Sequence, residues 1–146
     1  MVKSYQGVRK VEEKVIQQLL VKDFMTTQLI KFHPNQSIDE VVNILVYRNI
    51  SGGPVVDENN KLIGIISEGD CLKEMISGNY SNEPSLSGLV KDRMVKTVET
   101  LSPNHLILDA AIAFLDKKLR RFPVLENGEL VGQISQRDVM RALENG

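Results

Sequence analysis

The stretch 64–70 reads GIISEGD, and 68 positions later the stretch 132–138 reads GQISQRD. Both contain a glycine, an isoleucine two positions on, then a serine, and an aspartate three residues after the serine. Each stretch lies where a short apolar run changes to a segment with helical spacing. The chain is therefore organised around one pattern that occurs twice.

The repeat extends well beyond this pattern. A shift of 69 positions places 21–25 on 90–94 and 54–55 on 123–124, and a shift of 68 holds after a one-residue deletion in the turn that follows Asp57. Fourteen identities, nine before the gap and five after it, are spread over the whole unit. We interpret the chain as a duplicated domain. The expected organisation is an N-terminal extension at 1–20, repeat 1 at 21–76, a linker at 77–89 and repeat 2 at 90–146.

Each repeat predicts the order strand, helix, strand, strand, helix, which is an α+β fold. The expected elements are 29–32, a helix that begins after Ser37, 54–56, 62–66 and 70–75 in repeat 1, and 97–101, a helix from 107, 123–125, 130–134 and 138–143 in repeat 2. Ser37 and Glu40 form a capping box. Five apolar residues of each first helix have the spacing of a buried face: Ile38, Val41, Val42, Leu45 and Val46, and Ile107, Ala110, Ala111, Phe114 and Leu115.

Two further features concern packing. A unit of about 50 residues buries too little surface to be stable alone, so we expect the repeats to pack against each other. In the N-terminal extension, apolar residues at helical spacing predict an amphipathic helix: Val8, Val11, Val15, Ile16 and Leu19.

Composition restricts the class of protein. Of the 146 residues 42% are hydrophobic and 25% charged, and the net charge is −1, so no overall positive field attracts nucleic acid or an anionic membrane. The lone cysteine, Cys71, fits a reducing compartment. The N-terminus lacks the apolar core of a signal peptide, and no run approaches the ~20 apolar residues of a membrane helix. We expect a cytoplasmic protein.

Three ordered pairs of motifs resemble those of cystathionine-β-synthase (CBS) domains. They are the stretches quoted above, the strands GPVVD at 53–57 and RFPVLE at 121–126, and the segments DFMT at 23–26 and DRMV at 92–95, near the start of each repeat. The resemblance spans 21–143. It implies a free-standing tandem pair, or Bateman module, in which two repeats of β-α-β-β-α type pack with pseudo-twofold symmetry.

The same resemblance implies a function. Relatives hold adenosyl compounds (AMP, ADP, ATP or S-adenosylmethionine) in clefts between the repeats and signal by altered packing, usually as dimers. We therefore expect a non-enzymatic regulatory module with no required cofactor. Its expected partners are a small-molecule nucleotide, a second copy of the chain and a regulated protein, with neither nucleic acid nor membrane.

The Ser-x-x-Asp elements, Ser67 with Asp70 and Ser135 with Asp138, are the first candidate ligand residues. A helix N-terminus attracts phosphate, and a carboxylate in a cleft accepts hydrogen bonds from both ribose hydroxyls. The alternative is that each serine and aspartate only cap the following helix.

Arg120 and Arg121 precede the middle strand of repeat 2, where basic residues of relatives meet phosphates, and guanidinium groups suit that role. The alternative is the basic end of a helix, together with Lys117 and Lys118. Repeat 1 carries Gly52 and Gly53 there, followed by Pro54, and paired glycines allow a ligand to approach the backbone. The remaining candidates, Thr26 and Thr27, line the pocket in relatives or simply form a turn. We expect two unequal clefts, and the sequence leaves open which aspartate serves with the arginines.

Other chemistry has less support. His33, His105 and Cys71 lack the spacing of metal ligands, and no nucleophile–base pair is evident. A structural adaptor that kept the fold but lost its ligand stays open as the alternative function. An enzyme has the least support of the three hypotheses.

Overall fold

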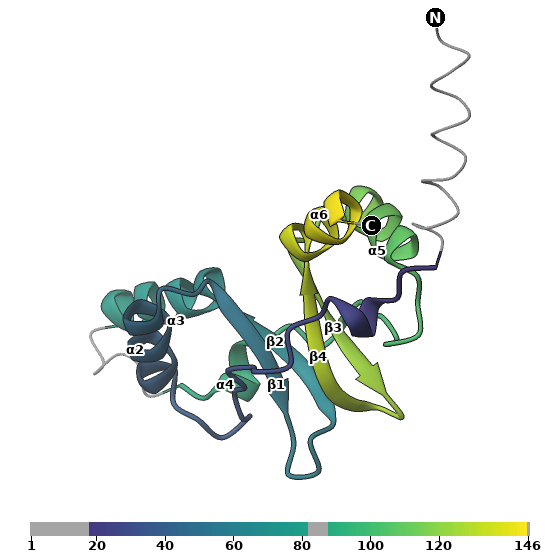
Figure 1. Ribbon diagram of the computed structural model, residues 1–146. Coiled ribbons are helices and arrows are strands. Elements are labelled where there is room, and N and C mark those ends of the chain that lie inside the picture. The colour runs from purple at the N-terminus through teal and green to yellow at the C-terminus, as the bar shows by residue number, and fades with distance from the viewer. Residues whose placement is uncertain (1–17, 82–87, 146) are drawn as a thin grey trace, which may run out of the picture. The chain divides into compact units, whose positions relative to one another are not determined.

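The computed structural model describes residues 18–81 and 88–145. Of the helix expected over 8–19, residues 8–17 lie outside the described residues, and Leu19 is not helical. The elements are η1 (Val21–Asp23), α2 (Ile38–Arg48), β1 (Gly52–Val56), β2 (Leu62–Ser67), α3 (Glu68–Ser81), α4 (Val90–Arg93), α5 (Ile107–Lys117), β3 (Arg121–Glu126), β4 (Glu129–Ser135) and α6 (Gln136–Asn145) (Figure 1). The α+β class predicted from the sequence is confirmed, because helices and two small sheets make up the described chain.

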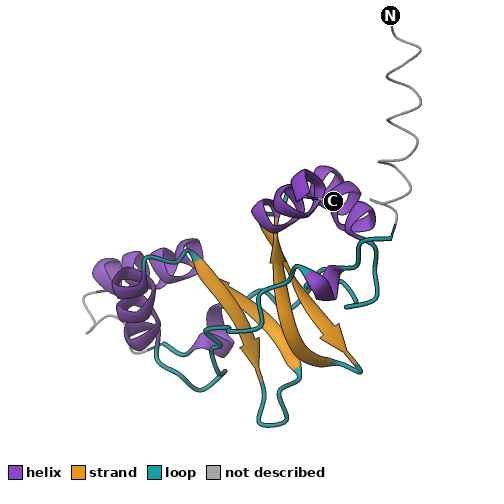
Figure 2. Ribbon diagram, in the orientation of Figure 1, coloured by secondary structure: helices purple, strands orange, loops and turns teal. Residues whose placement is uncertain are grey.

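Each sheet is a two-stranded hairpin (Figure 2). β1 pairs antiparallel with β2 from Gly52 opposite Ser67 to Val56 opposite Leu62, with an irregularity between Val55 and Val56. β3 and β4 are joined by a turn in which Asn127 (φ 54°) and Gly128 (φ 81°) are both left-handed. Two consecutive left-handed residues are typical of the tight turns that match the twist of a β-hairpin.

The chain divides into two compact units that do not follow the order of the sequence. Of the described residues, unit 1 contains 18–29, Glu99–Asn127 and 131–145, and unit 2 contains 30–81, 88–98 and Gly128–Leu130. We call 18–29 and 88–98 the leading segments of the repeats. Each unit thus joins the leading segment of one repeat to the body of the other.

Backbone hydrogen bonds hold the leading segment in unit 1. Thr26 and Gln133 of β4 each donate their N–H to the other's carbonyl, at 2.8 and 2.9 Å. Ile107, the first residue of α5, donates to the Leu19 carbonyl at 2.8 Å, and the Val21 N–H donates to the His105 carbonyl at 2.9 Å.

Unit 2 repeats this arrangement at the matching positions. Val95 and Ile65 of β2 exchange backbone hydrogen bonds of 2.8 and 2.9 Å, and Ile38 of α2 donates to the Gly88 carbonyl at 2.9 Å. Since isolated leading segments have no partners of their own, these bonds satisfy backbone groups that would otherwise need water.

A glycine in each second strand makes room for the leading segment. A Cβ on Gly64 would lie 2.8 Å from the Met94 sulfur and 2.9 Å from the Val95 carbonyl oxygen. A Cβ on Gly132 would lie 2.5 Å from the Met25 sulfur. The two glycines therefore serve close packing between a strand and a methionine of the leading segment.

Each unit has its own hydrophobic core. In unit 1, Phe114 of α5 and Phe122 of β3 meet with their ring centroids 4.6 Å apart. Around them lie Val21, Leu101, Ile107, Ala110, Val124, Ile134, Val139 and Ala142. The core of unit 2 consists of Phe32, Ile38, Val41, Leu45, Val55, Ile66, Cys71 and Val90.

The predicted buried faces of the first helices were too wide. Val46 of α2 is 76% exposed and Leu115 of α5 is 81% exposed, although both fit the helical spacing. Each helix packs on one side only, so the fifth apolar position turns outward. The predicted cap of α2 is confirmed, because Ser37 Oγ accepts the Glu40 N–H at 3.1 Å.

Two other elements differ from the sequence prediction. The first strands reduce to single parallel bridges, Phe32 to Val55 and Leu101 to Val124. Helix α3 continues to Ser81, past residue 77, where we expected the linker to begin. Extending an existing helix costs little, and Arg93 of α4 also anchors it through a 2.7 Å ion pair with Glu74.

None of the helices in the described ranges has the length and apolar content that crossing a bilayer requires.

The glycine contacts yield a test of the packing. We expect Gly64→Ala to lower the free energy of unfolding by about 1–3 kcal/mol, because the added Cβ must displace the Val95 backbone. Gly69→Ala is the matched control: its Cβ would approach nothing closer than Ser67 Oγ at 3.8 Å, and it should be neutral or slightly stabilising in α3. Urea unfolding measures both, and equal stability of the two variants would contradict this packing role.

Candidate functional site

The Ser-x-x-Asp elements lie at the junctions of β2 with α3 and of β4 with α6. In unit 2, Asp70 Oδ2 accepts hydrogen bonds from the Ser67 N–H and hydroxyl, both at 2.9 Å. In unit 1, Asp138 Oδ2 accepts the Ser135 N–H at 2.9 Å, and the Asp138 N–H donates to Ser135 Oγ at 3.1 Å. Both pairs therefore cap the helices that follow them.

Capping uses only one oxygen of each carboxylate. Both aspartates are buried, with 8% of their surface exposed. Within the described ranges Asp70 Oδ1 accepts no hydrogen bond, and Asp138 Oδ1 has only the Arg141 guanidinium, at 3.8 Å. A second acceptor oxygen in each junction is thus left for another donor, so capping and ligand binding are compatible.

Arg120 and Arg121 lie beyond the helix that precedes them. Helix α5 ends at Lys117 with Lys118 left-handed at its cap, and Arg121 is the first residue of β3. A contribution to the helix dipole falls off within the last turn, so that explanation does not apply to the two arginines. In the part of the chain that the structure describes, neither guanidinium has an ion pair or side-chain hydrogen bond.

Arg120 adjoins the start of α6. Gln136, the first residue of that helix, donates its N–H to the Arg120 carbonyl at 3.3 Å and its side-chain amide to the Leu119 carbonyl at 2.9 Å. These bonds fix the arginine pair near the junction that carries Ser135 and Asp138.

Six of the eleven candidates belong to unit 1: Thr26, Thr27, Arg120, Arg121, Ser135 and Asp138. Thr26 is bonded to Gln133, two residues before Ser135, and both threonines are exposed. The other five, Gly52, Gly53, Pro54, Ser67 and Asp70, belong to unit 2. The aspartate that shares a unit with the arginines is therefore Asp138, a pairing that the sequence left open.

The glycines of β1 have a reason within the fold. A Cβ on Gly52 would lie 2.5 Å from the Ile66 carbonyl oxygen, and one on Gly53 would lie 2.8 Å from the Phe32 ring. Gly53 and Pro54 are also buried. Strand pairing and the core therefore account for these residues without a ligand.

The sequence analysis did not name four residues that lie at repeat-equivalent positions near the two junctions. Val95 and Lys96 of the second leading segment take in unit 2 the place that Thr26 and Thr27 have in unit 1. Arg137 and Arg141 of α6 stand where α3 has Gly69 and Lys73. The repeat shifts carried a signal for three of them, because they pair Val95 and Lys96 with Thr26 and Thr27, and Arg137 with the neighbour of Asp70.

Cys71 follows Asp70 in α3 and is buried. Burial raises the pKa of its thiol above the usual value, and the negative charges of Asp70 and then Glu68 raise it further. The described residues contain no group of three or more histidines, cysteines or carboxylates that would hold a metal ion.

Comparison with known proteins identifies the family. The family model of the CBS domain matches residues 21–77 and 90–145. The chain belongs to the CBS-domain family. The structure of CBSX2 in complex with AMP is 30% identical, with a TM-score of 0.73 over 87% of this chain and 97% of that one. The CBS domain pair of MJ0100, in complex with 5′-methylthioadenosine and S-adenosyl-L-methionine, is 29% identical, with a TM-score of 0.68 over 86% and 96%.

Two curated relatives are longer than this chain. The CBS pair covers 42% of the Methanocaldococcus jannaschii protein MJ1225, at 28% identity over 84% of this chain. It covers 62% of the chloroplastic protein CBSX2 of Arabidopsis thaliana, at 31% identity over 84% of this chain. The chain thus spans less than two thirds of these two relatives.

The raised pKa of Cys71 yields a test of its surroundings. We expect the native thiol to react slowly with a disulfide reagent at pH 8 and fully after unfolding, because the reactive thiolate is disfavoured by burial. Glu68→Gln removes one of the two negative charges beside the thiol. It should therefore lower the pKa of Cys71 and shift the dependence of the reaction rate on pH toward lower pH. Cys71→Ser is the blank, and rapid reaction of the native protein at neutral pH would contradict the burial.

The raised pKa of Cys71 also makes the free energy of unfolding depend on pH. Because the folded thiol has the higher pKa, the unfolded state loses its proton first as the pH rises. Stability is therefore complete below the ordinary pKa of a thiol and declines as the pH rises toward the folded value.

Proposed function

We propose that this CBS pair is a regulatory module that binds an adenosyl ligand, with a phosphate-bearing nucleotide such as AMP in unit 1. The observation that carries the proposal is a grouping in unit 1. It joins a buried carboxylate, whose Oδ1 accepts no hydrogen bond from the described residues, with two arginines that have no ion-pair or side-chain hydrogen-bond partner among those residues. The complexes of CBSX2 with AMP and of MJ0100 with adenosyl compounds support it.

Each group in unit 1 has a defined part in this proposal. Asp138 Oδ1 accepts hydrogen bonds from the ribose hydroxyls while Oδ2 keeps the cap of α6. Arg120 and Arg121 contact the phosphate, where a guanidinium offers two parallel N–H donors. Thr26 and Thr27 border the ligand from the leading segment.

Regulation follows from the exchange of leading segments. A ligand held by Thr26, Thr27 and Asp138 joins the leading segment to the body of unit 1. It acts on the chain next to Leu29 and Ile30, where the chain passes from one unit into the other. Ligand at 100 times its dissociation constant adds about 2.7 kcal/mol to the stability of the state it binds.

The first test is titration of AMP by calorimetry and by thermal shift. We expect AMP to bind and to raise the melting temperature, and Asp138→Asn to weaken binding at least about tenfold, since an amide keeps one acceptor oxygen for the cap but loses the second. Asp116→Asn, an exposed change of the same charge on α5, is the control and should bind as wild type. If AMP, ADP, ATP and S-adenosylmethionine all fail to bind, the ligand-free adaptor is the better description.

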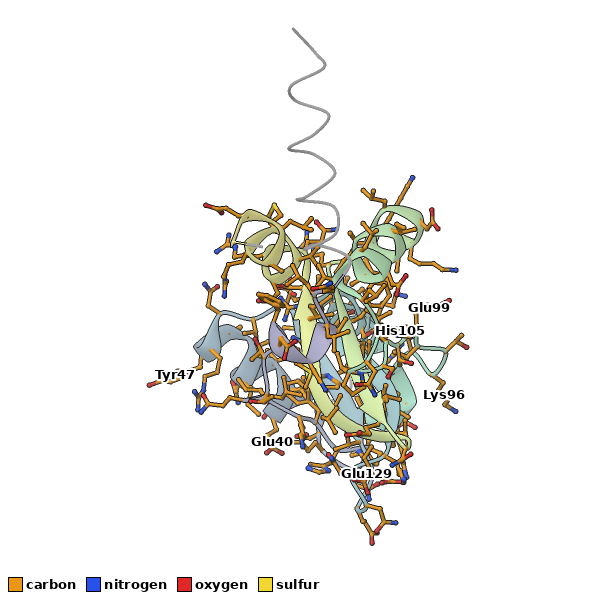
Figure 3. The ribbon with its side chains drawn as sticks, turned by 45° about the vertical axis from the view of Figure 1, so that its right-hand side comes forward. Glu40, Tyr47, Lys96, Glu99, His105 and Glu129 are labelled. Atoms are coloured by element: carbon orange, nitrogen blue, oxygen red, sulfur yellow. The ribbon has the colours of Figure 1, made fainter. Side chains whose placement is uncertain are left out.

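A second part of the proposal concerns a homodimer. Both helix pairs carry large exposed apolar side chains: Val46, Tyr47, Leu72 and Ile76 on α2 and α3, and Ile112, Leu115 and Met140 on α5 and α6. Tyr47 projects away from α2 (Figure 3) and is 89% exposed. Clustered exposed apolar residues mark interaction surfaces, and we propose that a second copy of the chain covers them.

Sedimentation velocity tests this surface. We expect the wild-type chain to form a dimer. Leu115→Gln should weaken the dimer about tenfold or more, because the substitution removes an apolar contact that only the dimer makes. Leu115→Met, which keeps the apolar surface, is the matched control. A wild-type monomer at concentrations of tens of micromolar would contradict the homodimer.

A further inference from the structure

The connection between α5 and β3 leads into both arginines of unit 1, and few contacts of its own hold it in place. It begins at Lys118, which is left-handed (φ 54°). Leu119 is 37% exposed, and Arg120 is exposed. The guanidinium groups of Arg120 and Arg121 have no side-chain partner among the described residues. Their position therefore depends on how firmly the backbone of the connection is held.

Gln136, the first residue of α6, holds this connection by two hydrogen bonds. Its side-chain amide donates to the Leu119 carbonyl at 2.9 Å, and its backbone N–H donates to the Arg120 carbonyl at 3.3 Å. The place of Gln136 is itself fixed, because it follows Ser135 directly in the turn that Asp138 caps. Gln136 therefore anchors the connection to the junction that carries the proposed ribose acceptor.

The matching connection of unit 2 is held in another way. Glu68 takes the position of Gln136, and its N–H donates to the Ser51 carbonyl at 2.9 Å, so the backbone bond is common to both units. Ile50, which corresponds to Leu119, packs against the core of unit 2. An ionised carboxylate has no hydrogen to donate. Within the described ranges, the side-chain bond is therefore found only in the unit that has the arginines.

The side-chain bond of Gln136 is not needed to satisfy the Leu119 carbonyl. The bond lies at the surface, and an exposed carbonyl can accept a hydrogen bond from water instead. Leu119 is also not among the described residues that form or line the core of unit 1. The Gln136 amide thus takes in unit 1 the anchoring part that core packing of Ile50 has in unit 2.

We propose that Gln136 is a positioning residue for phosphate, whose side-chain amide fixes the connection so that Arg120 and Arg121 are in place before a ligand arrives. This inference rests on the proposed function, because it assumes that the two arginines contact a phosphate. Groups that are ordered before binding lose less conformational freedom on binding. A guanidinium that forms two parallel bonds to phosphate oxygens is sensitive to its placement. Gln136 thus acts on phosphate affinity without touching the ligand.

Binding of AMP and of adenosine separates positioning from a general structural role. Gln136→Met keeps an uncharged side chain of similar length and the backbone bond to Arg120, but it removes the amide. We expect it to weaken AMP binding about three- to tenfold, the range for loss of one hydrogen bond. Adenosine has no phosphate, so its affinity should stay within about twofold of wild type. Calorimetry measures AMP, and ligand-observed NMR at millimolar concentrations measures adenosine.

Gln18→Met is the matched control. Gln18 is an exposed glutamine of unit 1. It adjoins Leu19, whose carbonyl is bonded to Ile107 at the start of α5, whereas the arginines follow the end of that helix. The control should bind both probes as wild type does. Equal loss of AMP and adenosine in Gln136→Met, or an unchanged affinity for AMP, would overturn the positioning role.

A double-mutant cycle shows whether Gln136 acts through the arginines. Arg120→Met with Arg121→Met removes both guanidinium groups and keeps much of their apolar stems. In that background Gln136→Met should change AMP affinity by less than about twofold, because the groups that it positions are gone. Arg120→Met alone, on an exposed side chain, serves if the double arginine variant fails to fold, and it should make the effect of Gln136→Met smaller. An effect of Gln136→Met that is equal with and without the arginines would contradict the proposal.

The two proposals fail in different ways. If AMP does not bind the wild-type chain, or binds equally well without the arginines, the proposed function is wrong and the positioning role falls with it. If AMP binding depends on Asp138 and on the arginines, but Gln136→Met binds AMP as wild type does, the proposed function stands and the positioning role is wrong.

Discussion

The exchange of leading segments is the constraint on which the rest of the structure depends. Thr26 is bonded to Gln133, and Val95 to Ile65, so each hairpin completes its backbone pairing with a segment from the other repeat. Gly132 and Gly64 have no side chain, which leaves room for Met25 and Met94 to pack against the strands beside these backbone pairs. Neither repeat contains a whole unit by itself, because each unit takes its leading segment from the other repeat.

The same exchange decides which residues share a site. Sequence order groups Thr26 and Thr27 with Asp70, because all three belong to repeat 1. The fold groups them with Arg120, Arg121 and Asp138 instead. A ligand in unit 1 would therefore draw on both repeats even though it lies within one compact unit.

Much of this could be predicted from the sequence, and the limits have physical causes. The repeat shift of 68 to 69 residues gave the hairpins and the helices, because turn residues and apolar periodicity are local signals. Pairing of the leading segments is a contact between distant parts of the chain, and no local pattern encodes it. The same holds for Val46 and Leu115, whose spacing fits a buried face although each helix is covered on one side only.

The candidate site shows the same division. The Ser-x-x-Asp pattern correctly marked both strand-to-helix junctions, but the pattern alone could not separate capping from binding. The structure shows why, since one carboxylate oxygen caps the helix and the other is left over. Because capping alone would retain Ser67 with Asp70 and Ser135 with Asp138, their presence in both repeats says little about ligands. Residues that have no part in capping or packing are more informative about ligands. Here the two units differ in charge, because Arg120 and Arg137 of unit 1 correspond to the uncharged Ser51 and Gly69 of unit 2.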